Sequence, residues 1–220
     1  MLRVGLTGGL GSGKSTAARL FAEHGAHVFS SDAIGREMME PGQTVYDAIV
    51  AHFGPGVVMP DGRLDRAALA RIAFEDGRVE ELNAIVHPAV IRRQAELADE
   101  IFSRDRSAVV VVESALILET KYGELRAGVR ARWRSRFDKL VLVTAPDEVK
   151  VRRFVERHGE ALSDERRAEL EAEARRRLAQ QMSDDRKAAF CDYVLTNGGL
   201  VKELEWQVDQ LWPILQVAAR

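Results

Sequence analysis

The stretch GGLGSGKS, residues 8–15, has the residue types and the spacing that bind a phosphate chain. It matches G-x-x-x-x-G-K-[ST] at every position. Glycines let successive backbone N–H groups turn toward one anion, and the N-terminus of a following helix adds the positive end of its dipole. We therefore expect Gly11, Ser12, Gly13 and Thr16 to bind the phosphates of a nucleoside triphosphate.

Lys14 and Ser15 carry the charged and the metal-binding parts of this motif. Lys14 would place its ammonium on the β- and γ-phosphates, and the Ser15 hydroxyl would ligate the Mg²⁺ that bridges them. The loop alone does not distinguish kinases from switches or motors. A guanine-reading N-K-x-D motif is absent, because neither asparagine of the chain, Asn83 or Asn197, is followed by lysine.

Two carboxylates are candidates for the remaining chemistry. Asp32 follows a predicted strand, where it could face the loop across the crevice of the sheet and deprotonate an acceptor hydroxyl. Capping of the next helix is an equally open interpretation of Asp32. Glu113 ends the apolar run 109–112, as the acid of a Walker B strand does, and could hold Mg²⁺ or polarise a nucleophile. A plain loop carboxylate after a buried strand is the alternative for Glu113.

These side chains need a sheet whose strands end at one edge. Apolar and β-branched runs predict strands at 2–7, 26–29, 108–112, 139–144 and 192–196. Their alternation with helical patterns predicts a doubly wound α/β fold with a parallel sheet. Residues 33–104 are helical in pattern, broken by Pro and Gly turns and by His87-Pro88, and are expected to form an insertion over one end of the sheet.

Composition limits the class of protein. The 220 residues are 46% hydrophobic, with 32 basic and 34 acidic side chains, which fits a globular core and argues against nucleic-acid binding by bulk charge. No run approaches the roughly 20 apolar residues of a membrane span, so no membrane partner is expected. Cys191 is the single cysteine, which excludes an internal disulfide and favours the cytoplasm. We expect Cys191, Trp206 and Trp212 to pack in the core.

Two arginine-rich stretches, 126–136 and 152–177, flank the fourth predicted strand. The second also holds many glutamates, which predicts solvated helix faces with i,i+4 ion pairs. One or two of these arginines could reach a phosphate.

Motifs along nearly the whole chain resemble those of dephospho-coenzyme A kinases, in the same order. They are LTGGLGSGKST at 6–16, SDA at 31–33, EPG at 40–42, HFG at 52–54, DGRLDR at 61–66, LN at 82–83, HP at 87–88, LILE at 116–119, RLAQQ at 177–181 and NG at 197–198. The chain departs from the family at 114–115, where Ser-Ala replaces the usual proline segment. The stretches 119–137 and 159–177 look longer than usual.

The resemblance implies transfer of the ATP γ-phosphoryl group to the ribose 3′-hydroxyl of dephospho-coenzyme A, with Mg²⁺. It implies that Asp32 is the base, that His87 lines the acceptor side and that Asn197 lies near adenine. It also implies that Arg157, with Arg153 as the alternative, is a lid arginine on the ATP phosphates.

The resemblance further implies a P-loop NTPase fold with a nucleoside-monophosphate-kinase-like sheet. One domain would comprise a core (1–32, 105–150 and 190–220), a helical acceptor-binding region (33–104) and a lid (151–189). The oligomeric state is left open. Another small-molecule kinase on the same core and a non-catalytic nucleotide-binding regulator are the alternatives.

Overall fold

Five parallel strands form one sheet in the order β2-β3-β1-β4-β5. The computed structural model describes residues 1–122, 132–159 and 163–220. The strands are β1 (Leu2–Thr7), β2 (His27–Ser30), β3 (Val109–Glu113), β4 (Lys139–Thr144) and β5 (Tyr193–Thr196). Every strand expected from the sequence is confirmed, with its ends shifted by no more than one residue, and the fold is mixed α/β as predicted.

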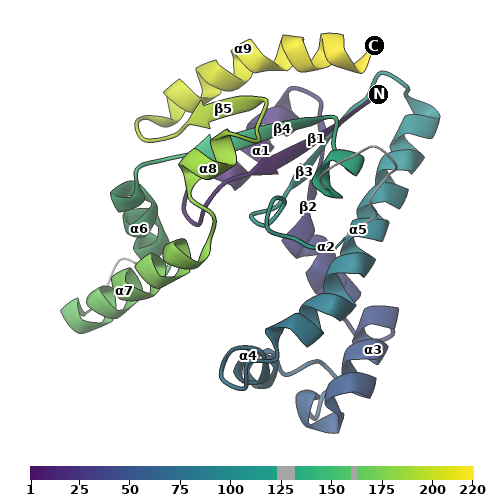
Figure 1. Cartoon of the computed structure of the whole chain (residues 1–220), viewed down its shortest axis with the longest axis vertical. Coiled ribbons are helices and arrows are strands. Elements are labelled where there is room, and N and C mark those ends of the chain that lie inside the picture. Colours follow the sequence, from purple (N-terminus) through teal and green to yellow (C-terminus); the bar gives the residue numbers. More distant parts are fainter. Residues whose placement is uncertain (123–131, 160–162) are drawn as a thin grey trace.

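Helices α1 (Lys14–Glu23) and α9 (Val201–Ala219) cover one face of the sheet (Figure 1). Phe21 and Leu215 from these helices are fully buried against strand residues. Trp212 packs there as expected, but the expectation for Trp206 is wrong, since 63% of it is exposed. Six residues make about one and two-thirds turns of an α-helix, which places the two rings roughly 120° apart around α9 and therefore on different faces.

The opposite face of the sheet packs against α5 (Val79–Arg104) and the short 3₁₀ helix η2 (Arg132–Ser135). Successive side chains of a strand point to opposite faces. Accordingly, Val109 and Val111 of β3 join the first core, whereas Val110 and Val112 join the second. Cys191 is half-buried against this second core, in agreement with its expected packing role.

A helical region after β2 forms a lobe with its own hydrophobic core. It comprises α2 (Ser31–Met38), α3 (Thr44–Phe53), the 3₁₀ helix η1 (Pro55–Val57), α4 (Arg66–Phe74) and the first half of α5. Residues 87 and 88 do not break the helical pattern, contrary to the sequence prediction, because α5 continues through Pro88. A proline inside a helix costs about 3 kcal/mol. Ala89 in this lobe and Phe102 in the sheet core anchor α5 at both ends, which offsets that cost.

A second lobe follows β4 and contains α6 (Asp147–Glu156), α7 (Asp164–Gln180) and α8 (Asp184–Ala188). Figure 1 shows α6 and α7 extending from the sheet on the side away from α3 and α4. Their outer faces carry ion pairs such as Arg152–Glu156 and Arg166–Glu169, as the charge pattern predicted. Arg126, Arg130 and Glu160 lie outside the described residues. None of the described helices is long and apolar enough to cross a membrane.

Candidate active site

The glycine-rich loop connects β1 to α1 at the carboxyl edge of the sheet. Gly11 and Gly13 have φ values of 69° and 93°, in the region that side chains rarely adopt. A Cβ on Gly11 would also collide with the carbonyl of Lys150, and one on Gly13 with the side-chain amide of Asn197. Only glycine fits these two positions, so the loop can bring its backbone close to a ligand.

Lys14 is the first residue of α1, and charged groups of both signs surround its ammonium. Its Nζ donates to the carbonyl of Gly9 at 3.1 Å. Burial lowers the pKa of Lys14, the nearby Lys187 and Arg157 lower it further, and Glu113 and Asp32 act in the opposite direction. The hydroxyl of Ser12 is buried and has no hydrogen-bond partner among the described residues. The Lys14 ammonium and the Ser12 hydroxyl are thus two groups suited to bind an anionic ligand.

Ser15 and Glu113 form the part of the site that suits a metal ion. The Ser15 hydroxyl donates to Glu113 Oε1 at 3.0 Å, which joins α1 to the end of β3. Mg²⁺ prefers oxygen ligands and usually takes one or two carboxylates plus water and substrate phosphates. The described residues hold no cluster of three or more His, Cys, Asp or Glu suited to a metal. The Ser15–Glu113 pair therefore fits Mg²⁺ brought in by a nucleotide.

Asp32 lies in the first turn of α2, directly after β2. The N-cap of this helix is Ser30, whose hydroxyl accepts from the amide of Ala33 at 3.4 Å. Capping therefore does not occupy Asp32, whose carboxylate is exposed. The strand before Asp32 is not the neighbour of β1, because β3 lies between β1 and β2, and Ser30 pairs in register with Glu113. Asp32, Glu113 and Lys14 consequently share one edge of the sheet.

Asn197, which follows β5, clamps the loop, and Arg153 on α6 holds Asn197 in place. Asn197 Nδ2 donates to the carbonyl of Ser12 at 2.9 Å, while Arg153 Nη1 donates to the carbonyl of Asn197 at 2.8 Å. Arg153 is thus engaged in holding the loop. Arg157 has no hydrogen bond or ion pair to its guanidinium within the described ranges. Both arginines line the same pocket, of about 290 Å³, together with Gly13, Thr16 and Asn197. They differ in that Arg153 is already bonded to Asn197. This geometry favours Arg157 over Arg153 as the arginine free to meet a nucleotide.

His87 belongs to a different part of the molecule. It is half-buried in α5, its Nδ1 lies 3.3 Å from the hydroxyl of Thr120, and its ring meets the ring of Tyr122 edge-on. Burial lowers the pKa of His87, so the ring is neutral at pH 7.

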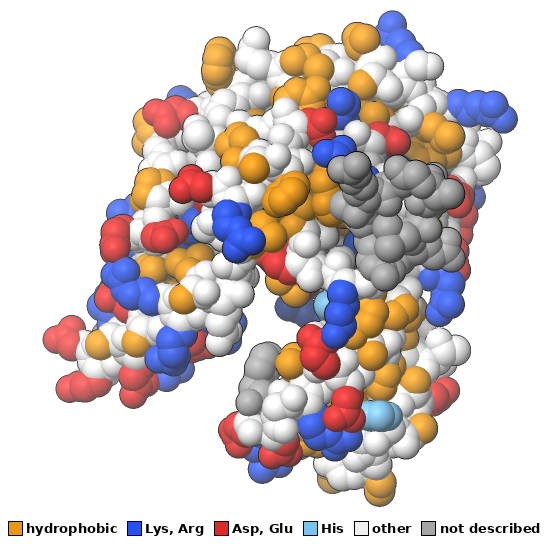
Figure 2. All heavy atoms as spheres, in the orientation of Figure 1, with side chains coloured by type: hydrophobic (Ala, Val, Ile, Leu, Met, Phe, Trp, Pro, Cys, Tyr) orange, Lys and Arg blue, Asp and Glu red, His pale blue; other side chains and the backbone are white. Residues whose placement is uncertain are grey.

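Figure 2 shows a hollow in the surface between the lobe of α6 and α7 and the lobe of α3 and α4.

Several contributors were not singled out from the sequence. Lys187 is fully buried, donates to the carbonyl of Ala115 at 3.2 Å and pairs with Glu119 at 2.9 Å. The amide of Leu10 in the loop donates to Gln181 Oε1 at 3.0 Å. The charged segment around Lys187 looks like any solvated helix face, so its sequence carries no signal for burial. The position of Gln181 within a family-like motif was the signal available for that residue.

Comparison with known proteins identifies relatives across the whole chain. The sequence model of the dephospho-CoA kinase family matches residues 2–203. The dephospho-CoA kinase of Thermobifida fusca is 37% identical, and the match covers 98% of this chain and 97% of the relative. That of Geobacter sulfurreducens is 39% identical over 95% and 96%. The Mycolicibacterium paratuberculosis relative is 40% identical over 96% of this chain, which spans 47% of its length.

Two solved structures share the fold. A crystal structure from Thermus thermophilus is 32% identical, covers 97% of both chains and has a TM-score of 0.72. The dephospho-CoA kinase from Campylobacter jejuni is 19% identical, covers 97% of this chain and 96% of its own, and has a TM-score of 0.57.

Proposed function

This chain belongs to the dephospho-CoA kinase family, and on that premise we propose that it phosphorylates the ribose 3′-hydroxyl of dephospho-coenzyme A with ATP. The products are coenzyme A and ADP, so the reaction is the last step of coenzyme A synthesis. The observation that carries the proposal is the convergence of Lys14, Glu113 and Asp32 at one edge of the sheet. A phosphate-binding cation, a metal-binding acid and a free base are the groups that phosphoryl transfer to an alcohol requires.

The nucleotide side binds and orients ATP. Backbone amides of residues 8–13 and the N-terminus of α1 receive the phosphates, and the unpaired Ser12 hydroxyl adds a donor. Lys14 neutralises charge on the β- and γ-phosphates, and Arg157 meets the charge that develops during transfer. The pocket beside Asn197 and Arg157 receives the adenosine part of ATP. Ser15 and Glu113 would hold the Mg²⁺ that supplies charge neutralisation between the β- and γ-phosphates.

Asp32 performs the proton transfer. Its carboxylate accepts a hydrogen bond from the 3′-hydroxyl and orients the oxygen in line with the γ-phosphorus. As the oxygen–phosphorus bond forms, the bond to the β-phosphate oxygen breaks, ADP leaves, and the hydroxyl proton passes to Asp32. The alternative role of Asp32 as a helix cap is already filled by Ser30. The base assignment therefore agrees with an exposed carboxylate that has no hydrogen bond or ion pair among the described residues.

The two lobes divide the substrates. We assign residues 33–104 to acceptor binding, because this lobe carries His87 and flanks Asp32. We assign residues 151–189 to a lid that closes over ATP, because α6 carries Arg157 at its end and α7 packs beside the loop. Closure would exclude water, which otherwise competes as phosphoryl acceptor. The single cysteine supports a cytoplasmic location.

An assay with purified protein, ATP, Mg²⁺ and dephospho-coenzyme A tests the function directly. We expect acceptor-dependent ADP release and a product heavier by one phosphate in the mass spectrum. A panel of nucleosides and nucleotides as acceptors separates this activity from that of another small-molecule kinase. Tight ATP binding without acceptor-stimulated ADP release would instead identify a nucleotide-binding regulator and refute the proposal.

A further inference from the structure

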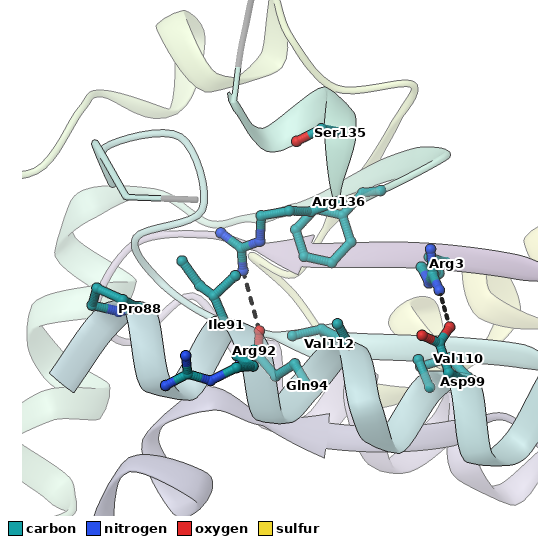
Figure 3. Close-up of a pocket in the computed structure, with 13 residues that line it drawn as sticks. Arg3, Pro88, Ile91, Arg92, Gln94, Asp99, Val110, Val112, Ser135 and Arg136 are labelled. Carbon is teal, nitrogen blue, oxygen red and sulfur yellow. Dashed lines mark hydrogen bonds and ion pairs between the residues drawn. The ribbon is translucent and has the colours of Figure 1, made fainter. Parts of the chain in front are cut away.

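A pocket of about 460 Å³ lies on the face of the sheet opposite α1 and α9, between α5, β3 and residues 135–137 (Figure 3). Its lining extends along α5 from Pro88, next to His87, to Asp99. At 1.5 Å per residue this part of the helix is roughly 16 Å long. The pocket thus begins beside the acceptor lobe and follows α5 away from the catalytic edge.

The lining of this α5 pocket combines an apolar floor on the sheet with cationic side chains. Ala98, Val110 and Val112 supply the apolar floor. Arg92 and Arg136 supply positive charge, and no carboxylate within the described ranges pairs with either. Arg3 and Asp99, also in the lining, pair with each other. The pocket therefore suits an elongated ligand that carries negative charge on one part and an uncharged chain on the other.

Arg136 is the strongest indication of an anionic ligand. Its Nη2 donates to Gln94 Oε1 at 3.2 Å, and its guanidinium lies over the ring of Phe137 at 4.9 Å. Burial lowers the pKa of Arg136 to about 10, so the group stays charged at neutral pH. Arg136 is half-buried, and no carboxylate among residues 1–122, 132–159 and 163–220 pairs with it. A guanidinium has donors left over after one hydrogen bond, so an anionic ligand would stabilise this cation. Figure 3 shows this guanidinium directed across the pocket toward α5.

Gln94 connects Arg136 to the catalytic edge. This side chain is buried, and its Nε2 donates to the hydroxyl of Ser31 at 2.8 Å while its Oε1 accepts from Arg136. Ser31 is the residue before Asp32. One glutamine therefore connects the start of α2, which carries the proposed base, to the guanidinium of Arg136. A ligand whose hydroxyl meets Asp32 can place a neighbouring anionic group at Arg136.

We propose that the α5 pocket binds the diphosphate and pantetheine arm of the acceptor, with Arg136 on the diphosphate and the arm lying along α5. The inference rests on the proposed function, because that function supplies an acceptor with this sequence of groups. The ribose 3′-hydroxyl, the diphosphate and the long amide-containing arm follow one another in the molecule, as Asp32, Arg136 and the apolar floor do in the protein. Guanidinium groups bind phosphate oxygens in bidentate fashion.

The substitution Arg136→Gln tests the diphosphate contact. We expect the KM for dephospho-coenzyme A to rise about 10- to 100-fold, since hydrogen bonds to charged groups contribute about 1.5–3 kcal/mol, while the KM for ATP changes less than about twofold. Arg134→Gln is the matched control, because Arg134 is exposed, stacks on Trp133 and does not line the pocket. The control should keep the wild-type KM for both substrates.

A fragment of the acceptor and a variant that narrows the pocket test whether the pantetheine arm binds along α5. 4′-Phosphopantetheine, which carries a phosphate and the arm without the nucleoside, should compete with dephospho-coenzyme A in the wild type and in Arg134→Gln but not in Arg136→Gln. Ala95→Phe places a bulky ring on an exposed lining position and should raise the acceptor KM at least tenfold without lowering the melting temperature.

The outcomes separate the two proposals. Wild-type protein that fails to phosphorylate dephospho-coenzyme A would refute the proposed function. Active wild type with an unchanged acceptor KM in Ala95→Phe, or with no inhibition by 4′-phosphopantetheine, would overturn the pocket assignment. Because Ala95 is exposed, this test remains valid even if Arg136→Gln does not fold.

Discussion

The nucleotide side and the acceptor side of the hollow are built in different ways. On the proposed nucleotide side, backbone groups of residues 8–13 would receive the phosphates, and other elements hold those groups in place, as Asn197 does for Ser12 and Gln181 for Leu10. On the acceptor side, side chains such as Gln94 and Arg136 come from separate elements and meet only after folding. The proposed phosphate site therefore uses groups from one contiguous segment, whereas the proposed acceptor site combines side chains from separate elements.

We expect the largest effect from Lys14→Ala, which should impair the nucleotide side and leave the acceptor side intact. Lys14→Ala removes the charge on the β- and γ-phosphates and should lower kcat roughly 10³-fold, the scale for loss of one electrostatic stabiliser in a transition state. The dissociation constant of dephospho-coenzyme A, measured by calorimetry, should stay within about twofold of wild type. A Lys14→Ala enzyme within tenfold of wild-type kcat would contradict the assignment of the loop.

Asp32→Asn should give the next largest loss. The amide keeps the shape of the side chain but cannot take a proton, so kcat should fall roughly 10²- to 10³-fold, in the range for general base catalysis. ATP affinity should be unchanged, because Asp32 lies beyond β3 from the loop. Wild-type turnover in this variant would remove Asp32 from the mechanism.

Asn197→Ala tests whether the loop depends on its clamp. The change leaves the carbonyl of Ser12 without its buried partner and releases one contact of Arg153. ATP affinity should fall about tenfold, which corresponds to about 1.4 kcal/mol, and the acceptor KM should not change. Asn83→Ala, within α5 of the acceptor lobe, is the control and should bind ATP normally. Equal ATP affinity in both variants would show that the clamp is dispensable.

The smallest expected effect concerns pH. Burial lowers the pKa of His87, so the unfolded chain takes up its proton at higher pH than the folded chain does. The contribution of neutral His87 to the free energy of unfolding is therefore fully present above the pKa of the unfolded chain, near 6.5. It is lost as pH falls from there through the pKa of the folded chain. His87→Gln should reduce the fall in melting temperature between pH 7 and pH 5 by roughly 1–2 °C. An unchanged pH profile would indicate that His87 is not buried in solution.

The same contrast explains what the sequence could predict. The loop, Lys14 and Ser15 follow from one contiguous pattern, and the strands follow from runs such as residues 109–112. The roles of Arg153 and Arg157 could not be separated from the sequence, because residues four positions apart lie on the same face of a helix. Only the contact between Arg153 and Asn197 distinguishes them. The interpretation of Glu113 stayed open for the same reason, since its partner Ser15 is 98 residues away.

Two errors have a common origin. Local rules place a helix boundary at His87-Pro88, yet packing at both ends of α5 keeps that helix continuous. The amphipathic pattern of α9 predicts that Trp206 is buried, yet the face of α9 that packs on the sheet carries Trp212 and does not include Trp206. In both cases burial of other residues outweighs a local preference. The functional roles assigned to the individual site residues remain predictions.

The clamp on the glycine-rich loop has a consequence for how the enzyme is made. Gln181 and Asn197, which hold Leu10 and Ser12, follow these loop residues by 171 and 185 positions, so they are translated after the loop. A nascent chain that stops before β5 lacks the contacts that fix the phosphate-binding shape. ATP therefore stabilises the phosphate-binding loop best after β5 has joined the sheet, which links nucleotide binding to folding of the whole sheet.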